Sequence, residues 1–354
     1  MKSAVYLGKE NIEVREVPTP VCGDNDILVK NIRSSICGTD VAVYLNGPRI
    51  GHKVTVGGEF GHETVSRVVA MGKSITNVKV GDRVYPYPLN AKDDRKRAGT
   101  LGVFSEYILM PNAKLNHSYY MVDDSISDRV ASLIEPFTVG GRAAKKANPQ
   151  KGEKAVVFGC GTIGIAAAIM LKYLGAEQVM ICDKSDFRLN IAKELGFEIC
   201  NISESFLDKA KDLFGEGFSI NGPTADIDIW IDAAGAESIL DDFIEYGKVD
   251  SRFVMVAVNN AERKINFLPI TYASKAIIGS GGYRPDDVTD VMNIMKSQRW
   301  DIEKIVTDEY MIDDINDAIR KAADSEHAFN VVVKFEPVSY THLDVYKRQM
   351  HRQR

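Results

Sequence analysis

The chain has 354 residues, of which 45% are hydrophobic and 26% are charged, and its formal net charge is −5. This length is enough for two domains with large cores, and the balance is typical of a globular protein. Nucleic-acid binding is not expected, because no segment concentrates Lys and Arg with aromatic residues. We expect no membrane span and no signal peptide, because no run of 18 apolar residues occurs and the first residues lack an apolar stretch. Five scattered cysteines, an odd number, favour a reducing cytoplasm over a disulfide framework.

The first part of the chain is typical of a β-rich domain with many turns. Short apolar and alternating stretches predict strands at 3–7, 12–17, 27–34, 63–71, 81–87 and 103–109. The first long helical pattern covers 128–147, and Pro149 ends it. We therefore expect a first domain over 1–148.

Strands and helices alternate beyond this point. Strands are predicted at 154–158, 178–182, 227–233, 253–258 and 276–279, with helices at 165–174, 187–195 and 235–246 between them. This alternation predicts an α/β domain with a doubly wound parallel sheet over 149–282. Residues 283–336 carry helices at 286–296 and 312–323 and a strand at 330–335, and by pattern alone they fit either domain. The tail, 337–354, is polar and aperiodic, and we expect it to be disordered and not native to the gene.

A glycine motif lies between the first strand and helix of the second domain. Gly159, Gly161 and Gly164 have the spacing G-x-G-x-x-G, and Thr162 and Ile163 lie between the last two. The first glycine allows a tight turn, the second lets the backbone approach a pyrophosphate, and the third lets the helix lie close to the strand. The pyrophosphate would bind the free N–H groups of the helix N-terminus. The context predicts dinucleotide binding, although an ordinary strand–helix turn is the simpler alternative.

The second strand of this domain ends at Asp183, about 20 residues beyond the glycines. A carboxylate at this place accepts a hydrogen bond from a ribose 2′-hydroxyl and repels a 2′-phosphate, so NAD is favoured. Lys184 and Arg188 are nearby cations, and they keep NADP open as the alternative.

Four side chains in separate segments are candidate metal ligands. Cys37 follows a strand, His62 and Glu63 are adjacent, and Glu135 lies in the long helical pattern. A thiolate, an imidazole and a carboxylate suit a catalytic zinc, which uses three protein ligands and keeps one open position. Each residue taken alone is more often a core or surface residue, and the large spacings leave the site undecided.

An ordered set of short motifs resembles the zinc-dependent medium-chain dehydrogenase/reductase family, in particular its sorbitol and threonine dehydrogenase branch. The motifs are C-G-T-D from Cys37, G-H-E around His62, V-G-D-R-V at 80–84, F-S-E-Y at 104–107, E-P from Glu135, and the glycine turn. The resemblance covers residues 1–336. It implies a GroES-like catalytic domain, built from 1–148 and 283–336, with a Rossmann domain inserted between these parts.

The resemblance implies roles for individual residues. Cys37 and His62 match zinc ligands, Glu63 matches a ligand of the polyol branch, and Glu135 matches a position that binds zinc or the water on it. Asp40 matches a carboxylate that orients the ligand histidine. Thr39 matches a hydroxyl that passes on the substrate proton. The remaining matches are adenosine-ribose contacts at Asp183 and Arg188, nicotinamide contacts at Val256, Ala257 and Val258, and substrate contacts at Tyr44 and Arg284.

Three departures from the family pattern matter. Residues 86–101 contain no cysteine, so we expect one catalytic zinc per chain and no structural zinc. Ala42 stands where the threonine dehydrogenases resembled here have a histidine, which weakens the threonine alternative. Arg142 stands where relatives often have a histidine. It either places a cation near the site or lies on a helix surface, and we favour the second.

Together these features predict an enzyme that interconverts a secondary alcohol, such as a polyol, sugar or cyclitol, and its ketone by hydride transfer to NAD. The alternatives are oxidation of an amino alcohol such as L-threonine, a zinc-free quinone or enoyl reductase of the same superfamily, and a binding protein without catalysis. By analogy with the family we expect a homodimer or homotetramer.

Overall fold

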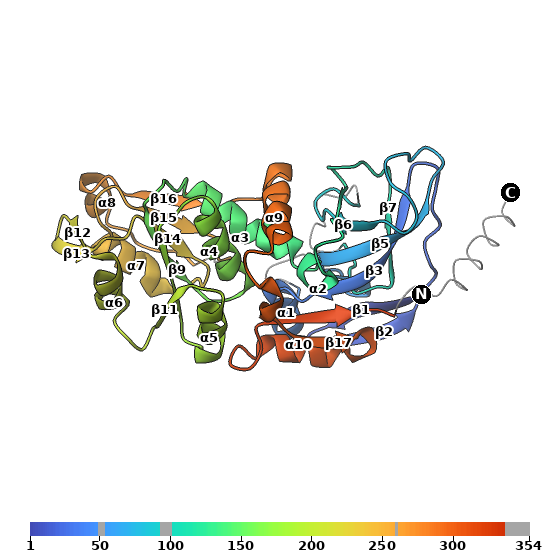
Figure 1. Cartoon of the computed structure of the whole chain (residues 1–354). Coiled ribbons are helices and arrows are strands. Elements are labelled where there is room, and N and C mark those ends of the chain that lie inside the picture. Colours follow the sequence, from blue (N-terminus) through green and yellow to red (C-terminus); the bar gives the residue numbers. More distant parts are fainter. Residues whose placement is uncertain (49–53, 93–100, 259–260, 337–354) are drawn as a thin grey trace, which may run out of the picture. The chain divides into compact units, whose positions relative to one another are not determined.

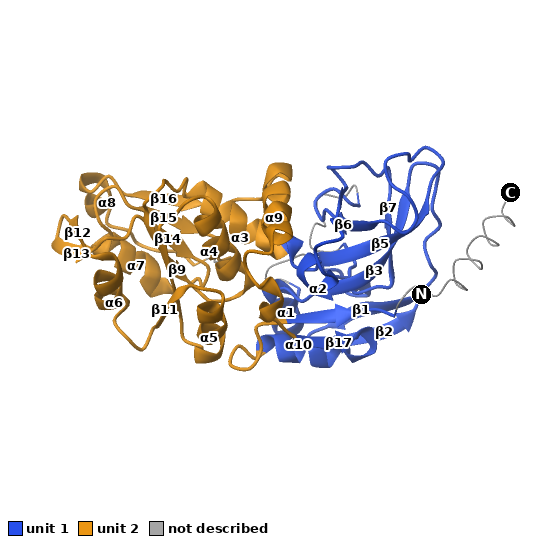
Figure 2. Cartoon of the chain, in the orientation of Figure 1, with its two compact units in different colours: residues 1–135, 308–323, 331–354 blue, residues 136–307, 324–330 orange. Residues whose placement is uncertain are grey.

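The computed structural model describes residues 1–48, 54–92, 101–258 and 261–336. The chain forms two compact units (Figure 2). Unit 1 contains Met1–Glu135, Asp308–Ala323 and the chain from Val331, and unit 2 contains Pro136–Thr307 and Asp324–Asn330. Each unit is therefore built from separate stretches of the sequence. The domain bounds expected from the sequence stay a prediction, as does the nature of the tail from 337, which lies outside the described residues.

Unit 1 contains two β-sheets (Figure 1). The smaller sheet has the order β2-β1-β4, and the larger has the order β17-β18-β3-β5-β6-β8, with β7 also paired to β3. Pairing of β3 with β5, β7 and β18 is antiparallel throughout. The strands are β1 (Lys2–Gly8), β2 (Asn11–Glu16), β3 (Ile27–Ser35), β4 (Gly58–Glu59), β5 (Glu63–Met71), β6 (Arg83–Pro86), β7 (Tyr107–Met110), β8 (Tyr119–Met121), β17 (Val306–Met311) and β18 (Asn330–Lys334).

Short helices complete unit 1. Helix α1 (Gly38–Asn46) follows β3 directly, and α10 (Ile315–Ala323) packs against it. Helix α2 (Asp128–Ala131) is capped by Ser127, whose hydroxyl accepts a hydrogen bond from the Val130 amide. Ser35 at the end of β3 and Glu63 at the start of β5 are both buried, which matters for the site described below.

Unit 2 is built on a parallel sheet with the order β11-β10-β9-β14-β15-β16. The order reverses between β9 and β14, which is where doubly wound sheets bind ligands at the carboxyl ends of the strands. These strands are β9 (Lys154–Phe158), β10 (Gln178–Asp183), β11 (Glu198–Asn201), β14 (Ile229–Asp232), β15 (Arg252–Met255) and β16 (Ala276–Gly279). An aromatic cluster fills one side of the core, where Trp230 stacks on Phe158 at a ring distance of 5.6 Å.

Helices and one hairpin surround this sheet in Figure 1. Helix α4 leads from β9 to β10 and is buried from residue 164 to residue 171, as its run of alanines and aliphatic residues predicts. The helices are α3 (Ile134–Lys146), α4 (Thr162–Tyr173), α5 (Asp186–Glu194), α6 (Phe206–Phe214), α7 (Glu237–Tyr246), α8 (Leu268–Tyr272) and α9 (Pro285–Ser297), and the hairpin consists of β12 (Glu216–Ser219) and β13 (Gly222–Ala225).

The predicted fold class, α/β with a β-rich domain and a doubly wound parallel sheet, is confirmed by the sheet topology, with local differences. The helix expected over 128–147 was wrong as one element, because the chain turns at Ser132 and Leu133 between α2 and α3. The strand expected over 253–258 ends at Met255, since the amides of Val256 and Ala257 both donate to the Asp232 carbonyl instead. Helix α1, with Ala42 inside it, was not predicted, because its weak amphipathic pattern is short.

Candidate metal centre and cofactor site

Three of the four predicted metal ligands lie together in unit 1. The ligand atoms of Cys37, His62 and Glu63 all lie within 4.8 Å of one another. His62 Nε2 is 3.8 Å from Glu63 Oε1. Both of these side chains are buried, and Glu63 Oε2 has no hydrogen-bond partner among the described residues. A sulfur, a nitrogen and an oxygen donor therefore converge, although 25 residues of sequence separate Cys37 from His62.

Strand pairing brings these residues together. Ser35, at the end of β3, lies opposite Glu63, at the start of β5. Cys37 is the N-cap residue of α1, two residues beyond Ser35, and His62 precedes β5. Gly61 makes the turn into β5 with a φ of +87°, and a Cβ at this position would come within 2.5 Å of the Phe104 ring. Only a glycine fits there without moving its neighbours.

Asp40 and Thr39 lie in the first turn of α1 beside the ligand group. The Asp40 carboxylate accepts a hydrogen bond of 3.0 Å from the Cys37 amide, which fixes the start of the helix. Burial raises the pKa of Asp40 to about 6, while His62 lowers it. The Thr39 hydroxyl is buried and makes no hydrogen bond of standard geometry with the described residues, although it lies near enough to the Cys37 sulfur to lower the pKa of that thiol.

Burial and like charges shape the protonation of the ligand group. Burial is the main cause that raises the pKa of Cys37 well above its ordinary range, and the carboxyl groups of Glu63, Asp40 and Glu135 add to it. Burial, followed by Glu135, raises the pKa of Glu63 to about 7. Burial alone lowers the pKa of His62, but the carboxyl groups around it outweigh this and the pKa is raised. Because their pKa values are raised, Cys37 and Glu63 keep their protons to a higher pH than they would in water.

Glu135, the fourth predicted ligand, is buried in the first turn of α3. It does not share the 4.8 Å group, but it acts on Cys37, His62 and Glu63 through its charge. The structure therefore brings Glu135 close to the other three without making it a member of the tightest cluster.

The ligand group fits a zinc ion. Zinc bonds to sulfur, nitrogen and oxygen are about 2.0–2.3 Å long, so tetrahedral ligand atoms lie roughly 3.3–3.8 Å apart. The separation of 3.8 Å between His62 Nε2 and Glu63 Oε1 is a few tenths of an ångström longer than the roughly 3.3–3.5 Å of a nitrogen and an oxygen ligand on one zinc ion, so a small side-chain movement would bring both into bonding distance. A divalent cation would also favour the deprotonated thiol and carboxyl groups, whose pKa values are raised by burial and then by the neighbouring carboxyl groups.

The glycine turn in unit 2 has the geometry of a dinucleotide cradle. Gly159 has a φ of +101° and lies against the backbone of Ala233, at the point where the strand order reverses. A Cβ on Gly164 would lie 1.8 Å from the Gly159 carbonyl oxygen, so α4 and β9 approach as closely as glycine permits. The Cβ position of Gly161 is open, with only Arg188 Nη1 at 4.0 Å. The turn therefore leaves room for a ligand where the sequence predicted a pyrophosphate.

The predicted ribose contacts lie beside this turn. Asp183 accepts hydrogen bonds from the amides of Cys160 (2.6 Å) and Ser185 (2.9 Å), which hold the carboxylate at the end of β10. Arg188 donates from Nε and Nη2 to the Ala328 carbonyl and leaves Nη1 near the turn. Lys184 is exposed. One acid and two cations are thus present, and the choice between NAD and NADP stays open.

The other predicted cofactor residues lie at the same edge of the sheet. Thr162 and Ile163 open α4, and the Thr162 hydroxyl accepts a hydrogen bond from Asn330. The segment 256–258 follows β15, and Val258 is 85% exposed. Sequence reasoning missed Asp232, a buried carboxylate that accepts hydrogen bonds from the Ala234 and Gly235 amides. Its position at the end of a strand was the available signal.

The predicted substrate contacts, Tyr44 and Arg284, and the departure at Arg142 lie in or next to three different helices. Tyr44 is buried in α1, and its hydroxyl accepts a hydrogen bond of 2.9 Å from Arg320. Arg284 is exposed at the N-cap of α9 in unit 2, whereas the ligand group belongs to unit 1. Substrate contact by Tyr44 and by Arg284 stays a prediction. Arg142 lies 3.7 Å from the buried carboxylate of Asp287, so within unit 2 it forms an ion pair between α3 and α9.

Comparison with known families agrees with this geometry. Residues 23–118 match the family model "Alcohol dehydrogenase GroES-like domain", and residues 162–297 match "Zinc-binding dehydrogenase". The chain belongs to the zinc-dependent medium-chain dehydrogenase/reductase family. The predicted family and the general kind of enzyme, a zinc- and NAD(P)-dependent oxidoreductase of the alcohol dehydrogenase type, are confirmed.

Individual members of this family are similar over nearly the whole chain. L-threonine 3-dehydrogenase of Escherichia coli O1:K1 is 28% identical over 333 residues, which are 88% of this chain and 94% of that protein. The structure of 2R,3R-butanediol dehydrogenase from Bacillus subtilis matches with a TM-score of 0.82 at 24% identity, over 95% of this chain and 99% of the other. L-idonate 5-dehydrogenase from E. coli K-12 matches with a TM-score of 0.79 at 20% identity, over 94% and 98%. Among the described residues, no helix combines the length and the apolar character needed to cross a membrane.

Proposed function

We propose that this family member reversibly oxidises a secondary alcohol of a small polyol, sugar or cyclitol to a ketone, with NAD as the preferred cofactor and NADP as the alternative. The sulfur, nitrogen and oxygen donors of Cys37, His62 and Glu63, all within 4.8 Å of one another, carry the proposal. These residues would hold one catalytic zinc ion, with Glu135 as the alternative carboxylate ligand. When bound, zinc supplies a Lewis acid that lowers the pKa of an alcohol.

The chain's own groups at this site handle the proton. We assign the Thr39 hydroxyl, which is buried beside Cys37, to accept the substrate proton and pass it onward. The Asp40 carboxylate accepts a hydrogen bond from the Cys37 amide, and its charge contributes to the raised pKa of His62. We therefore assign Asp40 to orient these two residues. Both assignments require the first turn of α1, which places Thr39 and Asp40 next to the N-cap cysteine.

The cofactor would be held by unit 2 and would supply the hydride acceptor. The open space at Gly161 and the free amides at the start of α4 would bind the pyrophosphate. Asp183 would accept from the adenosine ribose, with Arg188 beside it, and 256–258 would offer backbone groups near the nicotinamide. In this proposal the cofactor and the metal bind to different helices and strands, so substitutions can test each binding site separately.

A second candidate is oxidation of an amino alcohol such as L-threonine. The similarity to L-threonine 3-dehydrogenase favours it, whereas Ala42, in place of the histidine of that pattern, disfavours it. A zinc-free reductase and a binding protein without catalysis are disfavoured, because neither needs the converging donors. Tyr44 and Arg284 remain our proposed substrate contacts, and we propose a homodimer or homotetramer located in the cytoplasm, with no nucleic-acid partner.

The test combines metal analysis with a substrate screen. Purified protein is assayed with NAD and with NADP on polyols, cyclitols and L-threonine by absorbance of the reduced cofactor, and its zinc content is measured. We expect about one zinc per chain and turnover of a secondary alcohol, and Cys37→Ser should lose both while still binding NADH. Cys22→Ser, a buried cysteine elsewhere in unit 1, is the matched control. Turnover by zinc-free Cys37→Ser protein would refute the proposal.

A further inference from the structure

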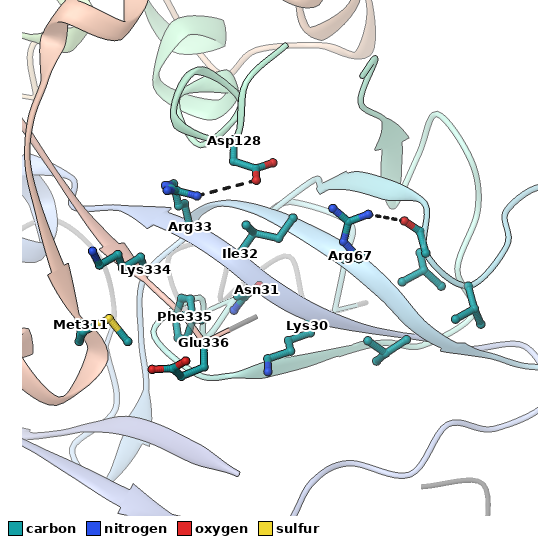
Figure 3. A pocket seen from close by; sticks show the side chains of 14 residues that line it. Lys30, Asn31, Ile32, Arg33, Arg67, Asp128, Met311, Lys334, Phe335 and Glu336 are labelled. Atoms are coloured by element: carbon teal, nitrogen blue, oxygen red, sulfur yellow. Dashed lines mark hydrogen bonds and ion pairs between the residues drawn. The ribbon is translucent and has the colours of Figure 1, made fainter. Parts of the chain in front are cut away.

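Unit 1 contains a cavity of about 700 Å³ that shares no residue with the metal group. It opens where the edge partner of β3 changes from β7 to β18. The Asn31 amide donates to Glu106, next to β7, and the Phe335 amide, just after β18, donates to Ile32. Residues of β3, β5, β17 and β18 surround the space (Figure 3). Its volume lies in the range of small-molecule binding sites, roughly 300–1,000 Å³.

Lys30 is the unusual side chain of this cavity. It is only 5% exposed, and its ammonium lies 5.7 Å from the centre of the Tyr107 ring. This ammonium makes no hydrogen bond or ion pair with the described residues. Lys275, a similarly buried lysine of this chain, instead donates to the carbonyls of Phe243 and Ile244. The Lys30 ammonium has no such partner among the described residues, and an anion in the cavity would pair with it.

Two further cations border the same space. Arg67 is the direct register partner of Lys30, so the two side chains leave the same face of the sheet. Its Nη1 donates to the Gly81 carbonyl at 2.7 Å, and its other N–H groups have no acceptor among the described residues. Lys334 has no ion-pair partner in that part of the chain either. Glu336 is the opposing charge in the lining. Burial lowers the pKa of Lys30, and the charges of Glu106 and Glu336 partly offset this lowering.

The remaining charges of the lining neutralise each other. Arg33 contacts Glu309 at 3.0 Å and Asp128 at 3.8 Å, and Asp128 also contacts Arg83 at 3.0 Å. Figure 3 shows Arg33 and Asp128 joined as a pair in the upper part of the view, with Lys30 in the lower part. The charge left in the lining is therefore positive and comes from Lys30, Arg67 and Lys334, against the carboxylate of Glu336 in the lining and that of Glu106, which also acts on Lys30.

Apolar side chains form the rest of the lining, including Val68, Val69, Val80 and Phe335. We infer that this cavity binds a small organic dianion with an apolar portion, a phosphate monoester or a dicarboxylate, held by Lys30 and Arg67. Arg67 offers a planar donor pattern that suits either anion, and Lys30 offers a point charge in a poorly solvated place. The ligand site is separate from the residues of the proposed reaction.

The zinc-loaded full-length protein is titrated calorimetrically with phenyl phosphate and, separately, with phthalate. Saturating NADH occupies the cofactor cradle, and the buffer contains no phosphate. We expect binding of at least one probe that weakens as salt rises, and the preferred probe distinguishes a phosphate ester from a dicarboxylate. Lys30→Met and Arg67→Gln should each weaken binding about tenfold or more, because each removes a charge-assisted contact.

Two controls make the result specific. Lys73→Gln removes an exposed lysine of unit 1 outside the cavity and should leave the affinity unchanged. Cys37→Ser should also leave it unchanged, so loss of the proposed reaction and loss of this site are distinguishable. Melting curves confirm that Lys30→Met folds, and Arg67→Gln provides the second, less buried variant. Two results would overturn the inference. One is that neither probe binds at about 10 mM, which corresponds to a binding free energy weaker than about 3 kcal/mol. The other is that both cavity variants bind the probes as tightly as the parent does.

Discussion

Ser35 and Glu63 lie directly opposite each other in the antiparallel pair of β3 and β5. This single register relationship brings Cys37, just beyond β3, to His62, just before β5. The ligand group therefore depends on the backbone geometry of the turn into β5, and a change that moves this turn should disturb metal binding without touching a ligand.

Gly61→Ala tests that dependence. The new Cβ would meet the Phe104 ring at 2.5 Å, and the backbone would keep an unfavourable φ of +87°. We expect a loss of roughly 3 kcal/mol in the free energy of unfolding and a loss of zinc. Urea denaturation and metal analysis measure the two effects. Gly57→Ala is the matched control, because Gly57 has a φ of +84° but open space around it. It should cost only about 1 kcal/mol and keep the zinc, and equal losses in both variants would contradict this account.

The glycine turn of unit 2 offers a second matched pair. Gly164→Ala would place a Cβ 1.8 Å from the Gly159 carbonyl and force α4 away from β9. We expect it to lower the free energy of unfolding by 3 kcal/mol or more, on the order of a severe overpacking substitution. Gly161→Ala has open space and an ordinary φ of −94°. It should cost about 1 kcal/mol in stability but weaken NADH binding about tenfold, because its methyl group occupies the place where a pyrophosphate approaches. Thermal melting and NADH fluorescence titration separate the two, and unchanged NADH affinity in Gly161→Ala would reject the cradle.

Zinc affinity should depend on pH. Zinc binds the deprotonated thiol and carboxyl, and in the metal-free site the pKa of Cys37 is raised well above its ordinary range and that of Glu63 to about 7. Below these pKa values protons compete with the metal, so the affinity should fall as pH falls, about tenfold per pH unit for each proton displaced. Competition with a fluorescent chelator at pH 6, 7 and 8 measures this slope. Glu63→Gln removes one of the competing protons and should flatten the slope below pH 7, and an affinity independent of pH would contradict the assigned ligands.

Lys275 predicts a pH effect on stability away from the metal site. Burial lowers the pKa of Lys275 from 10.5 to about 8. The folded state therefore gives up this proton at a lower pH than the unfolded state, so the contribution of Lys275 to stability rises between about pH 8 and pH 10.5 and is constant below.

The comparison of interest is between the parent and Lys275→Met. On going from pH 7.5 to pH 9.5 we expect the parent to gain about 1 kcal/mol in unfolding free energy relative to this variant, after allowance for partial solvation. Urea denaturation of both proteins at both pH values measures these unfolding free energies. Lys193→Met, which alters an exposed lysine of α5, should show no such difference, and a fall with pH in the Lys275 comparison would reverse the assigned sign.

Local sequence patterns were sufficient to predict much of the secondary structure of this protein and its glycine turn. The glycine spacing, the flanking strand and helix, and the acid at Asp183 predicted the cofactor turn, because these features follow from the conformation of neighbouring residues. The donor types of Cys37, His62 and Glu63 suit zinc, but their assignment as ligands of one site came from the resemblance to the family. Strands such as 276–279 were predicted at their observed bounds for the same local reason.

Only the tertiary structure decided which distant residues meet. The pairing of Ser35 with Glu63 brings the ligand atoms of Cys37 and His62 together, and no local pattern fixes a register between two strands. The burial of Tyr44, and the lack of a partner for the Lys30 ammonium among the described residues, are equally invisible in the sequence, since burial and charge balance depend on neighbours far along the chain. The physical reason is that a strand carries its apolar and polar pattern within itself, whereas its partners are set by packing of the whole unit.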